Sequence, residues 1–389
     1  MQSRNHCVLS FYEALQIELP DNRDNRGRKH NICFVVFGVI IGILIGRITV
    51  SSIHRYLDVQ FDWLYEISGF PADTVISRAQ LPRLLLVVDW QIVSKLTIRY
   101  FGLIVVDLPN NDWSAVDGKE LRGCLQTLST GLKEKRAVSM INVIRHLNRQ
   151  QVGLAYYEGD KESEIPSTRD LLTNSGLAEK SISLDALHCN PTTTTLIVKA
   201  GGRYLIGVKG NQPEMLSDFT QLHQRTNATF ELEPTFEKEH GRIEERTTYV
   251  YNVEKEYFDK RWKESQIHTL VVTERQFECL KTGKVSNATA FHITNQKLGN
   301  TPEPICRELA TAVRGHWQVE NDNQVRDVTF KEDDLKVKNR ELAKNLASIW
   351  SAAIAIIKKA NPLNYKRQIE FFQLKHDQLL EFLRDIHFL

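Results

Sequence analysis

The chain has 389 residues, more than one small domain needs and enough for a catalytic core with one or two accessory modules. Hydrophobic residues make up 42% and charged residues 25% of the chain, which are ordinary globular values and exclude global disorder. The formal net charge is only +2, so bulk charge does not point to a nucleic-acid partner. The six cysteines are scattered without zinc-ligand or redox spacing, which is typical of a reduced compartment without a structural metal.

An apolar run over residues 32–46 follows a basic flank, as a membrane anchor would. It extends for about 15 residues, fewer than the roughly 18–20 that cross a bilayer. No small-residue cleavage site follows it. We therefore predict a buried helix and no membrane partner, with membrane anchoring through this run as the alternative. Glycines at every fourth position, Gly38, Gly42 and Gly46, would let a neighbouring helix approach closely.

Residues 1–100 are predicted to be mostly helical. Ser51 or Ser52 could cap a helix that begins near Ile53, and residues 81–89 form another buried segment. We assign residues 1–100 to a helical N-terminal accessory domain. Small helical modules of this kind suit DNA-end binding or dimerisation.

From about residue 112 the pattern changes to short strands. We expect strands at residues 113–116, 137–144, 151–157, 181–184 and 203–208, and helices at 167–174 and 192–200. This β-β-β-α-β-α-β order predicts an α/β fold with a mixed sheet covered by helices. Functional side chains gather at the carboxyl ends of the strands in such sheets.

The last 180 residues interrupt and then complete this order. Strand-like runs at 247–253, 267–273 and 289–294 predict a β-rich insertion, and helical patterns follow at 305–320, 338–360 and about 365–383. We therefore divide the rest of the chain into the first part of a catalytic core, residues 110–211; the insertion, residues 212–300; and a helical C-terminal part of the core, residues 301–389.

Three acidic residues occupy positions suited to metal-dependent chemistry. Asp117 and Asp185 each follow a predicted strand, so both side chains should lie at one sheet edge. Glu320, on a helix packed over that edge, would complete a cage for hard cations. Two such cations can promote in-line displacement at a phosphodiester. The pattern predicts Mg²⁺ as the cofactor, with Mn²⁺ as a substitute.

Ordered motifs carry a resemblance to a known family. Residues 116–123, with the sequence VDGKELRG, resemble the first catalytic motif of bacterial insertion-sequence transposases of the ISAs group, which includes the H repeat-associated reading frames. Similar blocks follow in the family's order at residues 161–165, 184–188, 208–212, 240–246, 314–321 and 326–333. These seven blocks span about 220 residues, and the stretch 21–30 with the apolar run after it extends the similarity to nearly the whole chain.

The resemblance implies a DDE transposase with an RNase H-like fold and a β insertion before the glutamate helix. It implies that Asp117, Asp185 and Glu320 form the acidic triad and hold Mg²⁺. The implied partners are the terminal inverted repeats of a transposon and target DNA, bound by a homodimer because an element has two ends. The implied location is the prokaryotic cytoplasm, with nucleoid association on DNA. The chain departs from the family at Asn323-Gln324 and Glu162, and neither departure touches the triad.

Eight further residues are predicted to contact DNA: Lys119, Arg122, Lys209, Asn211, His240, Arg242, His316 and Arg326. A polar strand exit is the alternative for Lys209 and Asn211, and an exposed turn is the alternative for His240 and Arg242.

The helix that carries the glutamate offers three further assignments. His316 could face the metals or a flipped base, whereas Trp317 is interpreted as core packing. Arg326 is expected to position the glutamate helix as well.

We predict a DNA transposase that hydrolyses phosphodiester bonds at transposon ends and then joins the freed 3′ hydroxyl to target DNA. No serine or tyrosine nucleophile is assigned. Two alternatives stay open: a nuclease of the same fold that cuts without joining, and a catalytically inactive DNA-binding descendant.

Overall fold

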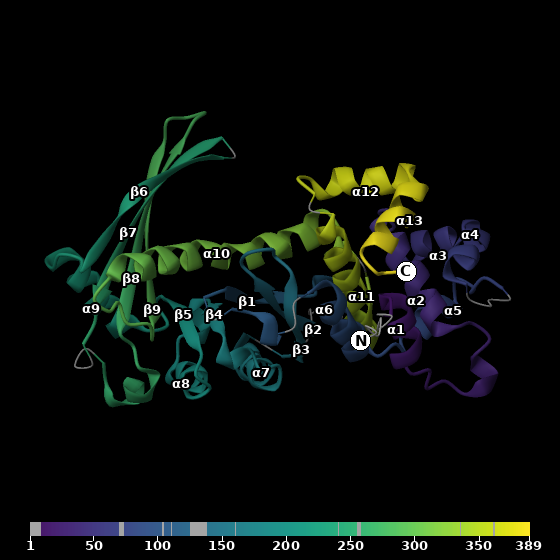
Figure 1. The fold of residues 1–389 in the computed structure, drawn as a ribbon, viewed down its shortest axis with the longest axis horizontal. Helices are drawn as coiled ribbons and strands as arrows, with labels where there is room; N and C mark the ends of the chain where they lie inside the picture. The colour runs from purple at the N-terminus through teal and green to yellow at the C-terminus, as the bar shows by residue number, and fades with distance from the viewer. Residues whose placement is uncertain are drawn as a thin grey trace, which may run out of the picture.

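The computed structural model describes residues 9–69, 74–102, 105–109, 111–124, 138–159, 161–239, 241–254, 258–334, 336–360 and 362–389. Its described strands form one nine-stranded sheet, and a long helix, α10 (Pro302–Val328), crosses that sheet (Figure 1). A group of helices lies at the other end of the molecule, on the right in Figure 1.

The N-terminal segment is mostly helical, as predicted. Its helices are α1 (Phe11–Glu18), α2 (Ile32–Leu44), α3 (Val50–Val59), α4 (Phe61–Ser68), α5 (Gln80–Leu85) and α6 (Trp90–Phe101), with short 3₁₀ turns η1 (Asn25–Gly27) and η2 (Val105–Asp107). The C-terminal helix α11 (Arg340–Lys359) packs against α2, α5 and α6 and buries Trp350 completely in their shared core. The two ends of the chain therefore build one helical core.

Helix α2 confirms the prediction of a buried helix for the apolar run. All thirteen of its residues are buried, and the Asn31 side chain caps it by accepting a hydrogen bond from the Phe34 amide at 2.9 Å. The glycine face lies against α3, where a Cβ on Gly38 would clash with Leu57. Within the described residues, every helix is too short or too polar to span a bilayer.

Helix α3 begins earlier than the sequence predicted. Thr49, not Ser51 or Ser52, is its N-cap: the Thr49 hydroxyl accepts from the Ser52 amide at 3.0 Å, and the Ser52 hydroxyl accepts from the Thr49 amide at 3.0 Å. This reciprocal capping box satisfies two amide groups that a later start would leave unpaired.

The nine strands are β1 (Trp113–Glu120), β2 (Val138–Arg145), β3 (Gln151–Glu158), β4 (Ser181–Leu184), β5 (Arg203–Val208), β6 (Phe230–Glu239), β7 (Arg242–Asn252), β8 (Thr269–Cys279) and β9 (Val285–Thr294). Their order is β3-β2-β1-β4-β5-β9-β8-β7-β6, with β1, β4 and β5 parallel and the remaining pairs antiparallel. The predicted mixed α/β sheet is confirmed, and the insertion strands extend that sheet because β9 pairs with β5.

Strand β1 is longer than predicted, so Asp117 lies within it. Its parallel pairing with β4 ends at Val116 and Leu184. Its antiparallel pairing with β2 continues, with Asp117 opposite Asn142 and Glu120 opposite Ser139. The strand persists because β2 still satisfies its backbone after β4 has ended.

Helices cover both faces of the sheet (Figure 1). On one face α7 (Lys161–Asn174) packs against β2 and β3, and α8 (Pro191–Lys199) packs against β5. On the other face α10 packs against β1, β2, β4 and β5. Helix α7 begins six residues before the prediction, because Pro166 is accommodated inside it rather than preceding it. Residues 161–165 are therefore helical.

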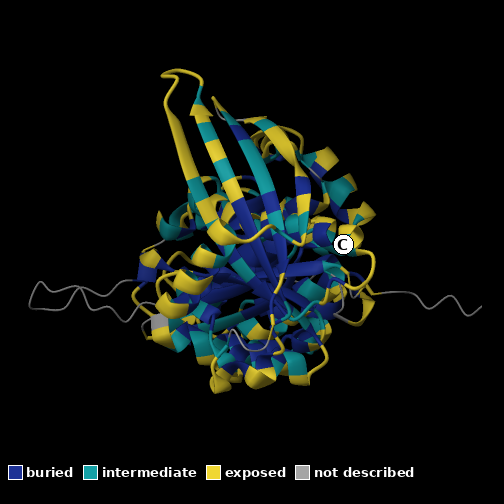
Figure 2. Cartoon of the chain, turned by 90° about the vertical axis from the view of Figure 1, so that its left-hand side faces the viewer, coloured by how far each residue is buried: buried dark blue, intermediate teal, exposed yellow. Residues whose placement is uncertain are grey.

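The insertion holds more regular structure than the sequence indicated. Helix α9 (Pro213–Arg225) and strand β6 were not predicted, since the Glu-rich β6 sequence has little strand character. We call β6 to β9 the insertion arm. In β8 the residues from Thr269 to Thr273 are buried, and the strands of the arm become exposed toward its tip (Figure 2).

The predicted final helix is broken at Lys375 into α12 (Tyr365–Leu374) and α13 (His376–Asp385). Remaining 3₁₀ turns are η3 (Arg122–Cys124), η4 (Leu177–Glu179), η5 (Ala186–His188), η7 (Lys260–Ser265) and η8 (Glu332–Asp334).

Two glycines that flank β5 test how closely this sheet is packed. A Cβ on Gly202 would clash with the backbone carbonyl oxygen of Ala178, whereas a Cβ on Gly210 meets no atom. We expect Gly202→Ala to lower the free energy of unfolding by about 1–3 kcal/mol, the usual cost of overpacking. Gly210→Ala is the matched control and should leave stability nearly unchanged in urea titrations. Equal losses in both variants would contradict the packing described here.

Candidate active site

Two carboxylates lie where the parallel part of the sheet ends. Val116 and Leu184 form the last parallel pair of β1 and β4, and Asp117 and Asp185 are the next residues in each chain segment. The Asp185 carboxylate caps η5 by accepting a hydrogen bond from the Leu187 amide at 3.0 Å. Both side chains therefore start from adjacent points of one sheet edge.

Helix α10 brings a third carboxylate to this edge. Val319 is fully buried against Ala115 of β1 and Ile144 of β2, which fixes the helix over the sheet. Glu320 follows Val319 and is exposed. One turn later the Asn323 side-chain amide donates to Asp117 Oδ2 at 2.9 Å. Since residues three apart share a helix face, Glu320 lies on the side of α10 that meets Asp117.

The three carboxylates influence one another electrostatically. Burial, and then the charges of Asp185, Glu164 and Glu320 in that order of size, together raise the pKa of Asp117 to about 7. Partial burial also raises the pKa of Glu320. The charge of Lys209 lowers this pKa, and the charge of Asp185 raises it. An acid with a pKa near 7 is half protonated at neutral pH, so this cluster is short of positive charge.

The cluster fits a divalent cation by its chemistry. Its donors are all carboxylate oxygens, which hard cations such as Mg²⁺ prefer, and a bound cation would relieve the mutual repulsion. As the described side chains lie, no three His, Cys, Asp or Glu residues form a closed cage for a metal. Nothing described hydrogen-bonds or ion-pairs with the Glu320 carboxyl, so its side chain is unconstrained.

A fourth acid, Glu164, lies beneath this edge and was given no role from the sequence. It is only 6% exposed; Tyr157 donates to its Oε2 at 2.9 Å, and His188 Nε2 lies 3.3 Å from its Oε1. A Cβ on Gly118 would clash with the Glu164 carboxylate. This contact explains why glycine follows Asp117, and that glycine is the sequence signal that could have indicated a buried neighbour.

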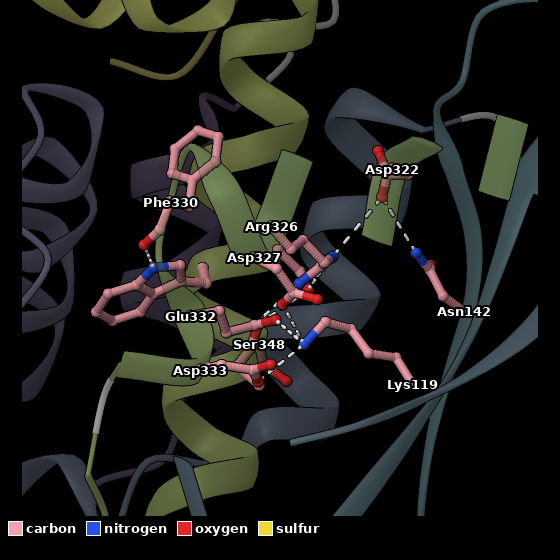
Figure 3. Close-up of polar contacts among 12 residues, drawn as sticks. Lys119, Asn142, Asp322, Arg326, Asp327, Phe330, Glu332, Asp333 and Ser348 are labelled. Atoms are coloured by element: carbon pink, nitrogen blue, oxygen red, sulfur yellow. Dashed lines mark hydrogen bonds and ion pairs between the residues drawn. The ribbon is translucent and has the colours of Figure 1, made fainter. Parts of the chain in front are cut away.

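Lys119 and Arg326, two of the predicted DNA-contacting residues, lie in a buried cluster of charges (Figure 3). Lys119 Nζ lies 2.8 Å from Asp327 Oδ1, 3.2 Å from Asp333 Oδ1 and 3.3 Å from Glu332 Oε2. Neither cation is presented at the surface. Their acidic partners lie near the end of α10 or just after it, so the cluster ties that end of the helix to β1.

Arg326 itself is 1% exposed. It lies 3.1 Å from Glu332 Oε1 and 3.6 Å from Asp322 Oδ2, and it donates to Ser351 Oγ at 2.7 Å. Lys358 of α11 adds a second ion pair to Asp322. These contacts give Arg326 the positioning role expected for it, because they join α10 to α11.

The other predicted DNA-contacting residues occupy varied environments. Lys209 and Arg242 are exposed, and Arg122 is exposed while its backbone amide donates to Asp333 Oδ1 at 3.2 Å. The Asn211 amide donates to the backbone oxygen of Ala186 at 2.5 Å, which fixes the loop after Asp185. His240 lies outside the described residues.

His316 faces the sheet rather than solvent. Its Nδ1 lies 3.0 Å from Ser183 Oγ, and His146 Nε2 lies 2.9 Å from the same oxygen. Burial lowers the pKa of His316 to about 4, so the ring is neutral at physiological pH. Trp317 was interpreted as core packing, yet 47% of it is exposed, because it projects from α10 toward the insertion arm.

The fold and the site define a class of protein. It is a mixed α/β protein in which three segments far apart in the sequence bring carboxylates to one sheet edge. Two curated relatives each match nearly all of the chain. "Putative transposase YncI" of Escherichia coli O157:H7 is 24% identical over 90% of this chain and 88% of its own length. "H repeat-associated putative transposase YhhI" of Escherichia coli strain K12 is 24% identical over 87% of this chain and 88% of its own length. The chain matches no protein-family model.

The chain is therefore similar over most of its length to H repeat-associated putative transposases. The resemblance based on ordered sequence blocks is therefore confirmed at the level of the family. The relatives cover the N-terminal helices as well as the sheet, since about nine-tenths of the chain aligns.

The raised pKa of Asp117 predicts a pH dependence of stability in metal-free protein. Folding favours the protonated acid, so its stabilisation is complete below the ordinary pKa of 3.8 and is lost as pH rises to about 7. Between pH 4 and 7.5 in EDTA, wild-type stability should fall by at most about 4 kcal/mol relative to Asp117→Asn. Thermal unfolding at a series of pH values measures this difference, and parallel curves for the two proteins would refute it.

The buried charge cluster predicts a large cost for removing one partner. Arg326→Met leaves Asp322 and Glu332 short of a cation, so we expect a loss of about 3–5 kcal/mol in the free energy of unfolding. Arg307→Met is the control: Arg307 lies on the same helix and pairs with Glu303 at 2.7 Å in solvent, so its loss should cost about 1 kcal/mol or less. Urea titration separates the two outcomes, and similar small losses would show that the cluster is not stabilising.

Proposed function

We propose that this chain is a DNA transposase that cuts phosphodiester bonds at the ends of a mobile element and joins those ends to target DNA. The observation that carries the proposal is that Asp117 and Asp185 lie at one sheet edge and that Glu320 lies on the helix that covers it. The similarity to relatives named as putative transposases supports it. DNA is accordingly the proposed partner, and two copies are proposed to act together on two ends.

We infer an RNase H-like core of the DDE type for this enzyme. The strand order β3-β2-β1-β4-β5, with the first three strands antiparallel and the last three parallel, supports this inference. The position of Asp117 on the central β1, of Asp185 after β4 and of Glu320 on a covering helix supports it as well.

In the proposed mechanism Asp117, Asp185 and Glu320 hold Mg²⁺ or Mn²⁺. When bound, the cations polarise the scissile phosphate and stabilise the charge that develops during in-line displacement. Asn323 keeps the Asp117 carboxylate oriented through its hydrogen bond to Oδ2, and Asn211 fixes the loop that carries Asp185.

The chain also supplies positive charge beside the acids. Lys209, at the end of β5, is exposed and close enough to Glu320 to lower its pKa. It can therefore neutralise a DNA phosphate that approaches the carboxylates. No side-chain nucleophile is required, because the attacking group is water in cleavage and a DNA 3′ hydroxyl in joining.

Cleavage and joining assays with the purified full-length chain test the proposal. The DNA that flanks the gene is first read for short inverted repeats, which then serve as substrates. With Mg²⁺ or Mn²⁺ present, Asp117→Asn, Asp185→Asn and Glu320→Gln should each lower the cleavage rate by at least about 100-fold, the scale for losing one preorganised electrostatic group. Glu303→Gln, on the same helix but paired only with Arg307, should cleave like the wild type.

The outcomes separate the alternatives. A variant of the triad that keeps near-normal cleavage removes that residue from the mechanism. If the protein cleaves the repeats but does not join pre-cut ends to target DNA, it is a nuclease rather than a transposase. A wild-type protein that binds the repeats but shows no metal-dependent activity would be a DNA-binding descendant.

A further inference from the structure

A cavity of about 130 Å³ lies beside the carboxylates, on the side that faces the insertion arm. Asp185 and Glu320 form its acidic end. Its other walls come from β5, the arm and α10, and they carry four cationic side chains: Lys209, Arg246, Arg275 and Arg314. The nearly neutral chain therefore gathers positive charge at one place next to the proposed reaction site.

Two of these cations oppose each other directly. Arg246 of β7 and Arg275 of β8 are partners in the antiparallel register, where like charges destabilise the strand pair. Glu244 neutralises Arg246, with an ion pair of 2.5 Å. Arg275 has no comparable partner among the described residues. Its Nε is buried and donates no hydrogen bond to any of them. Burial also lowers the pKa of Arg275.

An unpaired buried donor beside a like charge is costly unless an anion completes the site. Two like charges that face each other across a strand pair are an unfavourable arrangement, and such arrangements are expected mainly at functional sites. The nearest acids, Glu244 and Glu320, interact with Arg275 only through longer-range charge. An anionic ligand in the cavity would supply the partner that Arg275 lacks among the described residues.

An aromatic ring completes the wall. Trp317 is 47% exposed, and the Arg275 guanidinium lies 5.3 Å from its ring centroid. Farther up the arm, the ring of Phe277 lies 5.0 Å from Arg242 and 5.4 Å from Arg275. Alternating arginine and aromatic side chains are the combination that binds single-stranded nucleic acid, through phosphate contacts and base stacking.

We propose that this cavity binds one unpaired nucleotide of the DNA strand at the reaction site, with its phosphate on Arg275 and its base against Trp317. The proposal rests on the proposed function, because it takes the ligand to be DNA. The cavity is small, since typical ligand pockets measure about 300–1,000 Å³, and this favours one base over a base pair. Lys209 and Arg246 would hold the adjoining phosphates.

Binding of a fluorescent oligonucleotide tests the cavity without any cleavage. The probe is a 12-mer of thymidylate with one central 2-aminopurine, whose fluorescence is quenched when an aromatic ring stacks on it. The full-length chain is titrated with this probe in Ca²⁺, and with the same probe paired into a duplex. We expect quenching by the wild type for the single strand and much less for the duplex.

Variants identify the groups responsible. Trp317→Ala should abolish the quenching and weaken single-strand binding by about 5- to 150-fold, the effect of losing one stacking aromatic, whereas Trp317→Phe should retain part of both. Arg275→Ala should weaken binding and reduce the slope of log affinity against log salt by about one. Arg307→Ala on α10 and Phe236→Ala on the arm, both exposed and away from the cavity, are the matched controls.

The proposal is overturned if Trp317→Ala and Arg275→Ala, shown to be folded by their thermal transitions, bind and quench as the wild type does. It is overturned as well if the duplex is preferred. Probe binding requires no cleavage, so a failure of the proposed function appears only in the cleavage assay. A failure of the proposed nucleotide binding in the cavity appears only in this binding assay.

Discussion

The seating of α10 across the sheet is the interaction on which the candidate site depends. Contacts recur along one stripe of the helix at residues 315, 319, 323 and 326, which is the spacing of one helix face. At Gly315 even a Cβ would clash with His146, so the helix approaches the sheet very closely. Glu320 lies beside this stripe, so backbone packing sets where its Cα lies relative to Asp117, and its side chain stays free to adjust.

The buried charges at the end of α10 are the costly part of this arrangement. Removing ions from water costs several kcal/mol each, which their mutual attraction offsets only when the geometry is good and further hydrogen bonds are made. Arg326 meets these conditions through Asp322, Glu332 and Ser351. The ion pairs act together with the packing of Gly315 and Val319, which lie on the same face of α10. The rotation of α10 about its axis decides on which side of the helix Glu320 lies.

Much of the site could be predicted from the sequence because its signals are local. The short apolar strands before Asp185 and after α8 were predicted to the residue, as Ser181–Leu184 and Arg203–Val208. What failed depended on partners far along the chain. Lys119 reads as a free basic residue in its motif, and only the fold brings Asp327, Glu332 and Asp333 to it. Trp317 reads as core because its helix is amphipathic, but an arm whose last strand ends 23 residues earlier decides its exposure.

The same long-range assembly resolves the tension between a nearly neutral chain and the polyanionic partner proposed for it. Net charge measures only the sum, whereas binding responds to the local potential, which decays over about 8–10 Å at physiological salt. The carboxylate cluster alone would repel a DNA phosphate. Because β9 pairs with β5, the arm continues the sheet and brings Arg246 and Arg275 into the cavity lined by Asp185 and Glu320. Opposite unit charges about 4 Å apart attract by about 4 kcal/mol even with an effective dielectric constant of about 20. The insertion is therefore the element that makes an acidic sheet edge approachable by a nucleic-acid strand, and its continuity with the sheet matters more to the proposed binding than the total charge of the chain.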